Sequence, residues 1–201
     1  PIVAEAYLFR GDTFVLEPTE AETNSLARFG EAINAFSKIT ERFPTNEFAP
    51  LAWGRIGECH FQLATLDPKR YDSAANAFRR VLESPADASL RSQAEWKLGV
   101  VLEKQAQLKP PPERAALSEQ ALDHYLRVLY AKNLRPDEQP DPYWLKRAGL
   151  SAAELAESLK KWDVALGLTR RLITDLPILR PRLEKKIEDL QAARQSAETT
   201  P

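Results

Sequence analysis

Apolar residues recur at every third or fourth position through most of the chain, and prolines separate the stretches that show this period. Four stretches share one arrangement, an alanine followed by further inward positions four and seven residues later: Ala32-Phe36-Ile39, Ala74-Phe78-Val81, Ala121-Tyr125-Val128 and Ala165-Thr169-Leu172. This spacing places the three residues on one face of a helix. Pro44, Pro85 and Pro177 close three of the stretches, because proline does not continue a helix. The pattern predicts an all-α protein of successive amphipathic helices.

A second helical stretch precedes each of these four, and each contains a glycine. The four stretches are Tyr7-x2-Arg10-Gly11-x2-Phe14, Trp53-x2-Ile56-Gly57-x2-His60, Glu95-x2-Leu98-Gly99-x2-Leu102 and Leu145-x2-Ala148-Gly149-x2-Ala152. Two helices approach to about 8–10 Å only where the side chains at their crossing are small. We therefore expect each glycine to face the alanine-containing helix that follows it, with large residues filling the space one turn away.

Together these patterns resemble the tetratricopeptide repeat (TPR), whose first helix carries W-x2-L-G-x2-Y and whose second carries A-x3-F and a closing proline. The resemblance implies a right-handed solenoid of about four helix-turn-helix repeats, at about 4–44, 48–85, 90–131 and 141–177, in a single array over residues 1–201. The glycines are spaced more widely than in the standard repeat of about 34 residues. The excess falls in turns such as Glu17-Pro18-Thr19 and the stretch from Pro136 to Pro142. This predicts long helices joined by proline-stiffened turns.

The C-terminal segment has the pattern of a capping helix, at about residues 178–196. One face is apolar and carries Leu179, Leu183, Ile187 and Leu190. The other face is polar and carries Arg182, Lys185, Lys186, Glu188 and Asp189. A helix with one solvated face suits the end of a solenoid. We expect the tail from Ser196 to Pro201 to fray or to serve as a linker.

Composition and charge narrow the choice of partner. The chain has 28 Lys and Arg against 29 Asp and Glu, a net charge of −1, so it exerts no electrostatic pull on nucleic acid or on an anionic membrane. No apolar run approaches the roughly 18 residues that span a bilayer, and no basic-then-apolar leader opens the sequence. The single cysteine, Cys59, excludes an internal disulfide and leaves the redox compartment open. Because the chain opens at Pro1 and has no methionine, we expect a fragment or a processed form.

One junction between repeats resembles a particular group of TPR proteins. Residues 41–59, ERFPTNEFAPLAWGRIGEC, are similar to the "YP…A-x-A-x-x-x-L-G-x-C" phrasing of the Tol–Pal coordinator family and of outer-membrane assembly lipoproteins. The resemblance implies a bacterial scaffold within a multiprotein complex, and it favours the periplasm or cell envelope over the cytoplasm.

The TPR resemblance also implies where a partner binds, since the first helices of the repeats line the concave wall of such arrays. Positions one and five residues after the tryptophan-like place form two rows: Leu8, Gly54, Trp96 and Lys146, then Asp12, Glu58, Val100 and Leu150. We expect the partner-binding residues to be Leu8, Asp12, Glu58, Trp96, Val100, Lys146 and Leu150. Trp96 either holds a peptide or packs in the core in place of a tryptophan at position 95, and burial is the usual fate of large aromatics. Leu8 and Asp12 stand where the chaperone-tail class of TPR has a basic and asparagine clamp, which argues against that class.

Catalytic and metal-binding signatures are missing from the sequence. No G-x-x-x-x-G-K-[ST] loop, G-x-G-x-x-G turn or G-x-S-x-G elbow occurs. The side chains that could suggest catalysis or metal binding are those of Cys59, His60, Asp123 and His124. Cys59 and His60 are adjacent and so point about 100° apart on a helix, and they cannot readily share a ligand. His60 occupies an inward position, and we expect it to pack there with one ring nitrogen hydrogen-bonded. We expect no cofactor and no metal.

Three functions are compatible with these observations. The favoured one is a protein–protein interaction scaffold, not an enzyme, which binds a protein or peptide segment in its concave groove. The second is a structural or oligomerisation domain that supports a larger enzyme or regulator, and homo-oligomerisation is compatible with both. The third and weakest is a hydrolase or metal site at His60 or His124.

Overall fold

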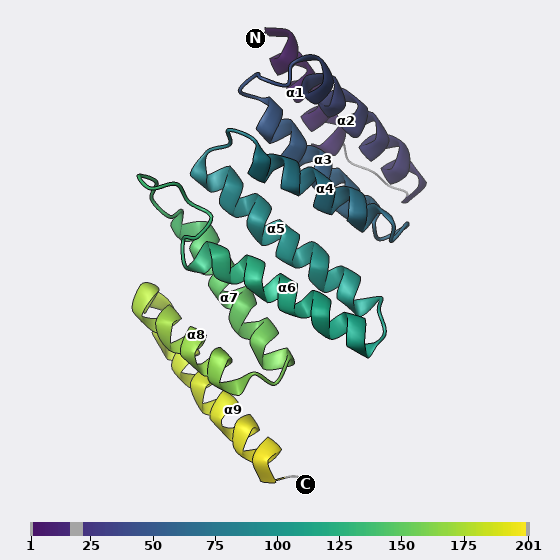
Figure 1. The fold of residues 1–201 in the computed structure, drawn as a ribbon. Helices are drawn as coiled ribbons and strands as arrows, with labels where there is room; N and C mark the ends of the chain where they lie inside the picture. Colours follow the sequence, from purple (N-terminus) through teal and green to yellow (C-terminus); the bar gives the residue numbers. More distant parts are fainter. Residues whose placement is uncertain (1, 17–21, 200–201) are drawn as a thin grey trace.

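The computed structural model describes residues 2–16 and 22–199, and within them the chain is all-α (Figure 1). These residues form nine α-helices and one short 3-10 turn, with no β-strand among them. The elements are, in chain order, α1 (Ile2–Leu16), α2 (Glu22–Arg42), α3 (Ala49–Leu63), α4 (Arg70–Glu83), α5 (Ala88–Gln107), α6 (Pro111–Leu129), α7 (Pro142–Ser158), α8 (Trp162–Asp175), η1 (Pro177–Leu179) and α9 (Arg180–Thr199). The turn expected at Glu17-Pro18-Thr19 lies outside the described residues.

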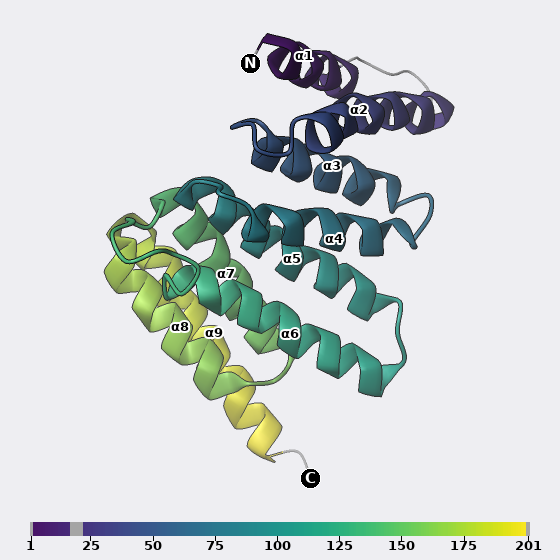
Figure 2. The ribbon, with the colours of Figure 1, turned by 45° about the horizontal axis from the view of Figure 1, so that its top comes forward.

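The helices pack consecutively, each against the one before it and the one after it. Figure 2 shows the resulting stack, which runs from α1 and α2 at one end to α8 and α9 at the other. α5 also contacts α3 and α7. The first helices of three successive pairs, α3, α5 and α7, therefore lie side by side on one face of the stack.

Glycines on the first helix of each pair allow the second helix to come close. A Cβ atom added to Gly57 would lie 2.7 Å from Cε1 of Phe78, well inside van der Waals contact. The same holds for Gly11 against Phe36 at 2.3 Å. Phe36 and Phe78 are 0% and 2% exposed, so their rings fill the space that a side chain at the glycine would need. This is the arrangement expected from the glycine and alanine patterns.

The third and fourth pairs follow the same plan with one change. Tyr125 meets Gly99, whose added Cβ would lie 2.4 Å from the ring. In the fourth pair Gly149 meets Leu172, at 2.5 Å, and not Thr169. Thr169 is too short to reach across the crossing, and its hydroxyl instead donates to the carbonyl of Ala165 at 2.8 Å. The residue one turn later fills the contact.

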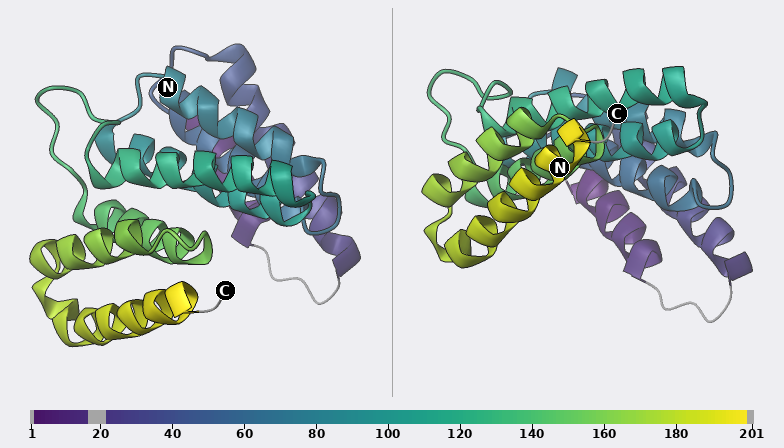
Figure 3. Two further views of the ribbon diagram at one scale, coloured as in Figure 1. Left: turned by 60° about the horizontal axis from the view of Figure 1, so that its bottom comes forward. Right: turned by 90° about the horizontal axis from the view of Figure 1, so that it is seen from below.

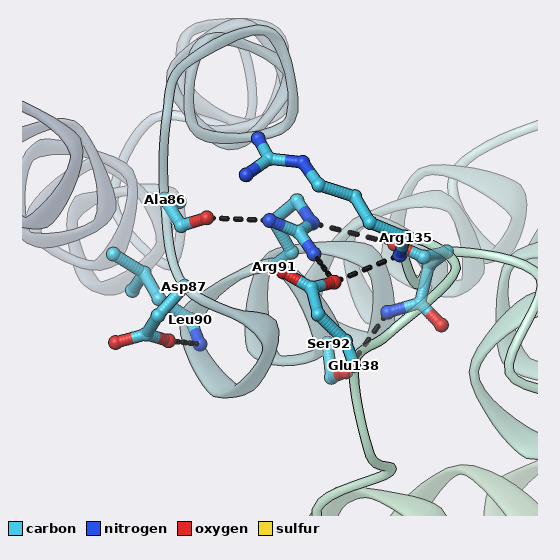
Figure 4. A network of polar contacts seen from close by, with 8 residues as sticks. Ala86, Asp87, Leu90, Arg91, Ser92, Arg135 and Glu138 are labelled. Atoms are coloured by element: carbon cyan, nitrogen blue, oxygen red, sulfur yellow. Dashed lines mark hydrogen bonds and ion pairs between the residues drawn. The ribbon is translucent and has the colours of Figure 1, made fainter.

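A buried arginine holds the long connection between α6 and α7 in place (Figure 4). Arg91 of α5 is 5% exposed, and its guanidinium donates to the carbonyls of Ala86 and Asn133 and to the carboxylate of Glu138. Glu138 also accepts from the backbone N–H of Arg135 at 2.8 Å. That hydrogen bond, together with Arg91, holds the pKa of Glu138 below its usual value. The proline-rich stretch is thus fixed by specific polar contacts in addition to its prolines.

The last helix differs in its bounds from the capping helix expected at 178–196. A 3-10 turn at Pro177–Leu179 precedes it, and α9 continues to Thr199. The expectation of fraying from Ser196 is wrong for residues 196–199, because the i,i+4 bond of Ser196 to Ala192 and the pair of Arg194 with Glu198 continue the helix. Thr200 and Pro201 lie outside the described residues.

The apolar stripe of α9 packs inward. Leu183 and Leu190 are 5% and 0% exposed, and Leu179 and Ile187 lie half-buried against the same core. The helices of the described residues include none with a stretch long and apolar enough to cross a membrane.

Candidate binding surface

Charged side chains at equivalent positions join the first helices of successive pairs. Arg55 of α3 forms an ion pair with Asp12 of α1 at 3.0 Å. Lys97 of α5 forms the next with Glu58 of α3 at 2.7 Å. In each ion pair, the basic residue stands two positions before the glycine of its own helix. The acidic residue stands directly after the glycine of the preceding first helix. Asp12 and Glu58, both expected to bind a partner, are therefore engaged by a neighbouring helix. Partly exposed pairs of this kind contribute at most about 1 kcal/mol each.

The equivalent contact between α5 and α7 is a cation–π contact and not an ion pair. Arg147 of α7 occupies the cation position, but Val100 stands where the acid would be. The Arg147 guanidinium instead lies over the ring of Trp96, 4.5 Å from its centroid. A cation over the face of an indole is a favourable electrostatic contact. This leaves Arg147 exposed, with no carboxylate partner among the described residues.

Trp96 is held within the packing between α5 and α7. Its side chain is 7% exposed. The indole Nε1 donates to the hydroxyl of Ser151 at 3.1 Å, and the ring packs against Trp144 with centroids 5.7 Å apart. Trp96 therefore supports the surface from below, and Arg147 covers it.

A hollow of about 320 Å³, which we call the central groove, crosses α3, α5 and α7. Its lining combines aromatic, aliphatic and charged side chains: Leu51, Gly54, Arg55, Glu58, Leu90, Gln93, Trp96, Lys97, Tyr143, Trp144 and Arg147. Tyr143 is 54% exposed at its edge. Three cations and one acid line the groove, so its local charge is positive although the whole chain is nearly neutral.

Lys146 and Leu150 belong to a second hollow of about 360 Å³, which we call the terminal cleft. It lies between α7, α8 and α9 and is lined by Lys146, Leu150, Ala153, Glu154, Thr169, Leu172, Leu179, Arg182, Leu183, Lys185, Lys186 and Asp189. Its floor is apolar and its rim is charged. The residues expected to form one site are thus divided between two hollows.

Leu8 and Val100 complete the expected set, and both lie half-buried. Leu8 packs against the core shared by α1, α2 and α3. Val100 packs against the core of the C-terminal half. Neither lines the central groove or the terminal cleft, so their contacts are those of packing residues.

The side chains considered for catalysis are buried or contact other side chains. His60 is half-buried with Nδ1 3.4 Å from a guanidinium nitrogen of Arg70, and burial followed by that charge lowers the pKa of His60. Cys59 is 1% exposed, and burial raises its pKa to about 12. His124 lies 2.9 Å from the carboxylate of Glu95. Within residues 2–16 and 22–199, no three His, Cys, Asp or Glu side chains are grouped to hold a metal ion.

Sequence reasoning missed several residues of both hollows. Tyr143, Trp144 and Arg147 border the central groove, while Arg182 and Lys185 border the terminal cleft. A signal for Arg147 was present, because a cation stands two residues before three of the four glycines. The α9 cations were assigned only to the solvated face of a cap, since the sequence does not reveal how far α9 stands from α7.

Comparison with known proteins adds no relative. No protein-family model matches the chain, and the search of curated proteins finds no significant match.

Proposed function

We propose that this chain is a right-handed TPR solenoid that acts as a protein–protein interaction scaffold and holds a segment of a partner protein in its central groove. Two observations support the TPR assignment. A glycine of the first helix meets a large side chain of the second in all four helix pairs, and ion pairs join α1 to α3 and α3 to α5 at equivalent positions. A resemblance to TPR proteins of the bacterial cell envelope, based on residues 41–59, supports a place in an envelope complex.

The observation that carries the binding proposal is the composition of the central groove. Arg147 is exposed, lies over Trp96 and is 5.9 Å from the ring of Tyr143. Arginine and aromatic side chains of this kind dominate the energetics of protein interfaces. The guanidinium is positioned by the rings beneath it, so it presents its N–H groups to a carboxylate without first losing rotamer freedom. A partner segment with an acidic residue beside an apolar one suits this surface.

Matched charge reversals test the proposal. Partners are first captured from the source cells with the wild-type chain and purified, and their affinities are then measured for two variants. Arg147→Glu reverses the charge in the central groove, and Arg79→Glu makes the same change at an exposed position of α4. We expect Arg147→Glu to weaken binding by about tenfold or more, with Arg79→Glu near wild type. If the partner bound both variants with equal affinity, the central groove would not be its binding site.

The alternative function, a structural or oligomerisation domain of a larger enzyme or regulator, is favoured by one feature of α1. Ile2, Phe9 and Leu16 are spaced by seven residues, which places them on one side of the helix, and they are 79%, 76% and 80% exposed. An exposed apolar stripe on a helix is typical of a contact surface. Sedimentation velocity of wild type and Phe9→Glu tests this reading: a self-association that Phe9→Glu abolishes supports it, and a monomeric wild type counts against it.

A further inference from the structure

The terminal cleft lies where α9 does not approach α7 as closely as α7 approaches α5. α5 lies close to both α3 and α7, and this close approach is not repeated between α7 and α9, nor between α1 and α3, all of which are fully described. α9 packs on α8 instead. The left view of Figure 3 shows α9 (yellow) set apart from α7. The apolar floor between them includes Leu150, Leu172 and Leu183.

One ion pair crosses the cleft. Lys186 of α9 reaches Glu157 of α7 at 2.5 Å, and this contact links the two walls. The other charged residues of the rim form no ion pair within the described part of the chain: Lys146, Glu154, Arg182, Lys185 and Asp189. All five are exposed, and their charges remain available to a bound molecule.

These charges are ordered along both walls. On α7 the cation Lys146 precedes the acid Glu154, and on α9 the cations Arg182 and Lys185 precede the acid Asp189. α7 and α9 run in the same direction, antiparallel to α8 (Figures 1 and 3). In each wall, the basic residues therefore lie nearer the helix N-terminus than the acid. A ligand complementary to this rim carries acidic groups at one end and basic groups at the other.

The lining also selects the backbone conformation of the ligand. An extended peptide needs hydrogen-bond partners for its N–H and C=O groups along its length. The charged side chains of the cleft lie at its rim, and the only polar side chain of the floor, Thr169, has its hydroxyl bonded to the carbonyl of Ala165. An α-helix satisfies its own backbone groups and offers an apolar ridge that fits a groove between two helices. An apolar floor with a charged rim suits an amphipathic helix.

We propose that the terminal cleft receives an amphipathic α-helix of a partner protein, acidic in its N-terminal half and basic in its C-terminal half. The inference rests on the proposed scaffold function and specifies a second contact of the same partner class. The apolar ridge of the helix enters between Leu150 and Leu183. The helix lies parallel to α7, so that its acidic turns face Lys146 and Arg182. Acidic residues near a helix N-terminus also complement its own dipole.

Three synthetic peptides test the proposal with purified chain. The first has about 18 residues, or five turns, with leucine along one face, glutamates in the first half and lysines in the second. The second has the same composition with glutamates and lysines exchanged, and the third has serine in place of leucine. By fluorescence anisotropy we expect the first to bind about tenfold tighter than the second, because rim charges discriminate between partners. We expect the third to show no binding.

Charge reversal of the protein completes the test. The Lys146→Glu/Lys185→Glu variant should exchange the preference between the first two peptides. A matched control, Lys69→Glu/Arg79→Glu, places the same charge change at exposed positions in and beside α4 and should keep the wild-type preference. All four positions are exposed, so we expect both double variants to keep the wild-type fold.

Two outcomes overturn the inference: equal affinity of the first two peptides for wild type, or a preference that Lys146→Glu/Lys185→Glu leaves unchanged. Either result leaves the proposed function intact if Arg147→Glu still releases the captured partner. Conversely, if the partner still binds the Arg147→Glu variant, the central groove is not its binding site. This conclusion holds for any result of the peptide measurements. The two proposals therefore fail separately.

Discussion

Replacing Gly57 by alanine perturbs the crossing of α3 and α4 by a single methyl group. The new Cβ would lie 2.7 Å from Cε1 and 2.9 Å from Cδ1 of Phe78, whereas carbon atoms pack at about 3.5–4.0 Å. Phe78 is 2% exposed, so its ring has no free space to enter. Overpacking costs about 1–3 kcal/mol, and alanine recovers up to about 1 kcal/mol of helix propensity relative to glycine. We expect Gly57→Ala to lower the free energy of unfolding by about 1–2 kcal/mol.

The same substitution at Gly30 is the control. Gly30 lies within α2, and an added Cβ there meets no atom within 4 Å. Only the propensity gain remains, so Gly30→Ala should raise the free energy of unfolding by up to about 1 kcal/mol. Urea denaturation followed by far-UV circular dichroism measures both variants under one set of conditions. A Gly57→Ala variant as stable as wild type, or more stable, would refute the assignment of Gly57 to a close helix crossing.

Three further predictions concern buried and charged groups. Phe78→Ala should lower the free energy of unfolding by about 3–5 kcal/mol in the same urea assay, and a change below that of Gly57→Ala would contradict its place in the core. The pKa of Glu138 is lowered in the folded state, so its contribution is present above the unfolded value of 4.5 and is lost as pH falls through the folded pKa. Glu138→Gln should therefore reduce the drop in urea midpoint between neutral pH and about pH 3, and parallel profiles for the two proteins would count against this. Because burial raises the pKa of Cys59 to about 12, a disulfide reagent at about pH 8 should label it only in urea; rapid labelling of the native chain would contradict that.

The positions of the helices and their buried faces could be predicted from the sequence. Ala74, Phe78 and Val81 were placed on one inward face by their spacing, and all three are buried. Gly57 was predicted to mark a close crossing, and it meets Phe78. These features depend on residues within a few turns of each other, where period, small side chains and prolines act directly on the local backbone.

The candidate site was predicted only in part. The choice of helix face was informative, since Glu58 and Trp96 line the central groove and Lys146 and Leu150 line the terminal cleft. Their roles were not predictable, because they depend on partners distant in sequence. Glu58 meets Lys97, and a residue so engaged cannot be distinguished from a free one by its own position in a repeat.

By itself, the sequence determined that this protein is a succession of amphipathic helices with glycines at the crossings, because helix period and steric bulk are local properties. Only the tertiary structure decided which side chains meet between helices. In the folded chain, Trp96 is buried beneath Arg147. Leu172, and not Thr169, packs against Gly149, and a cleft lies between α7 and α9. These outcomes follow from the tilt and separation of whole helices, which the 3-10 turn before α9 and the packing of many side chains set together.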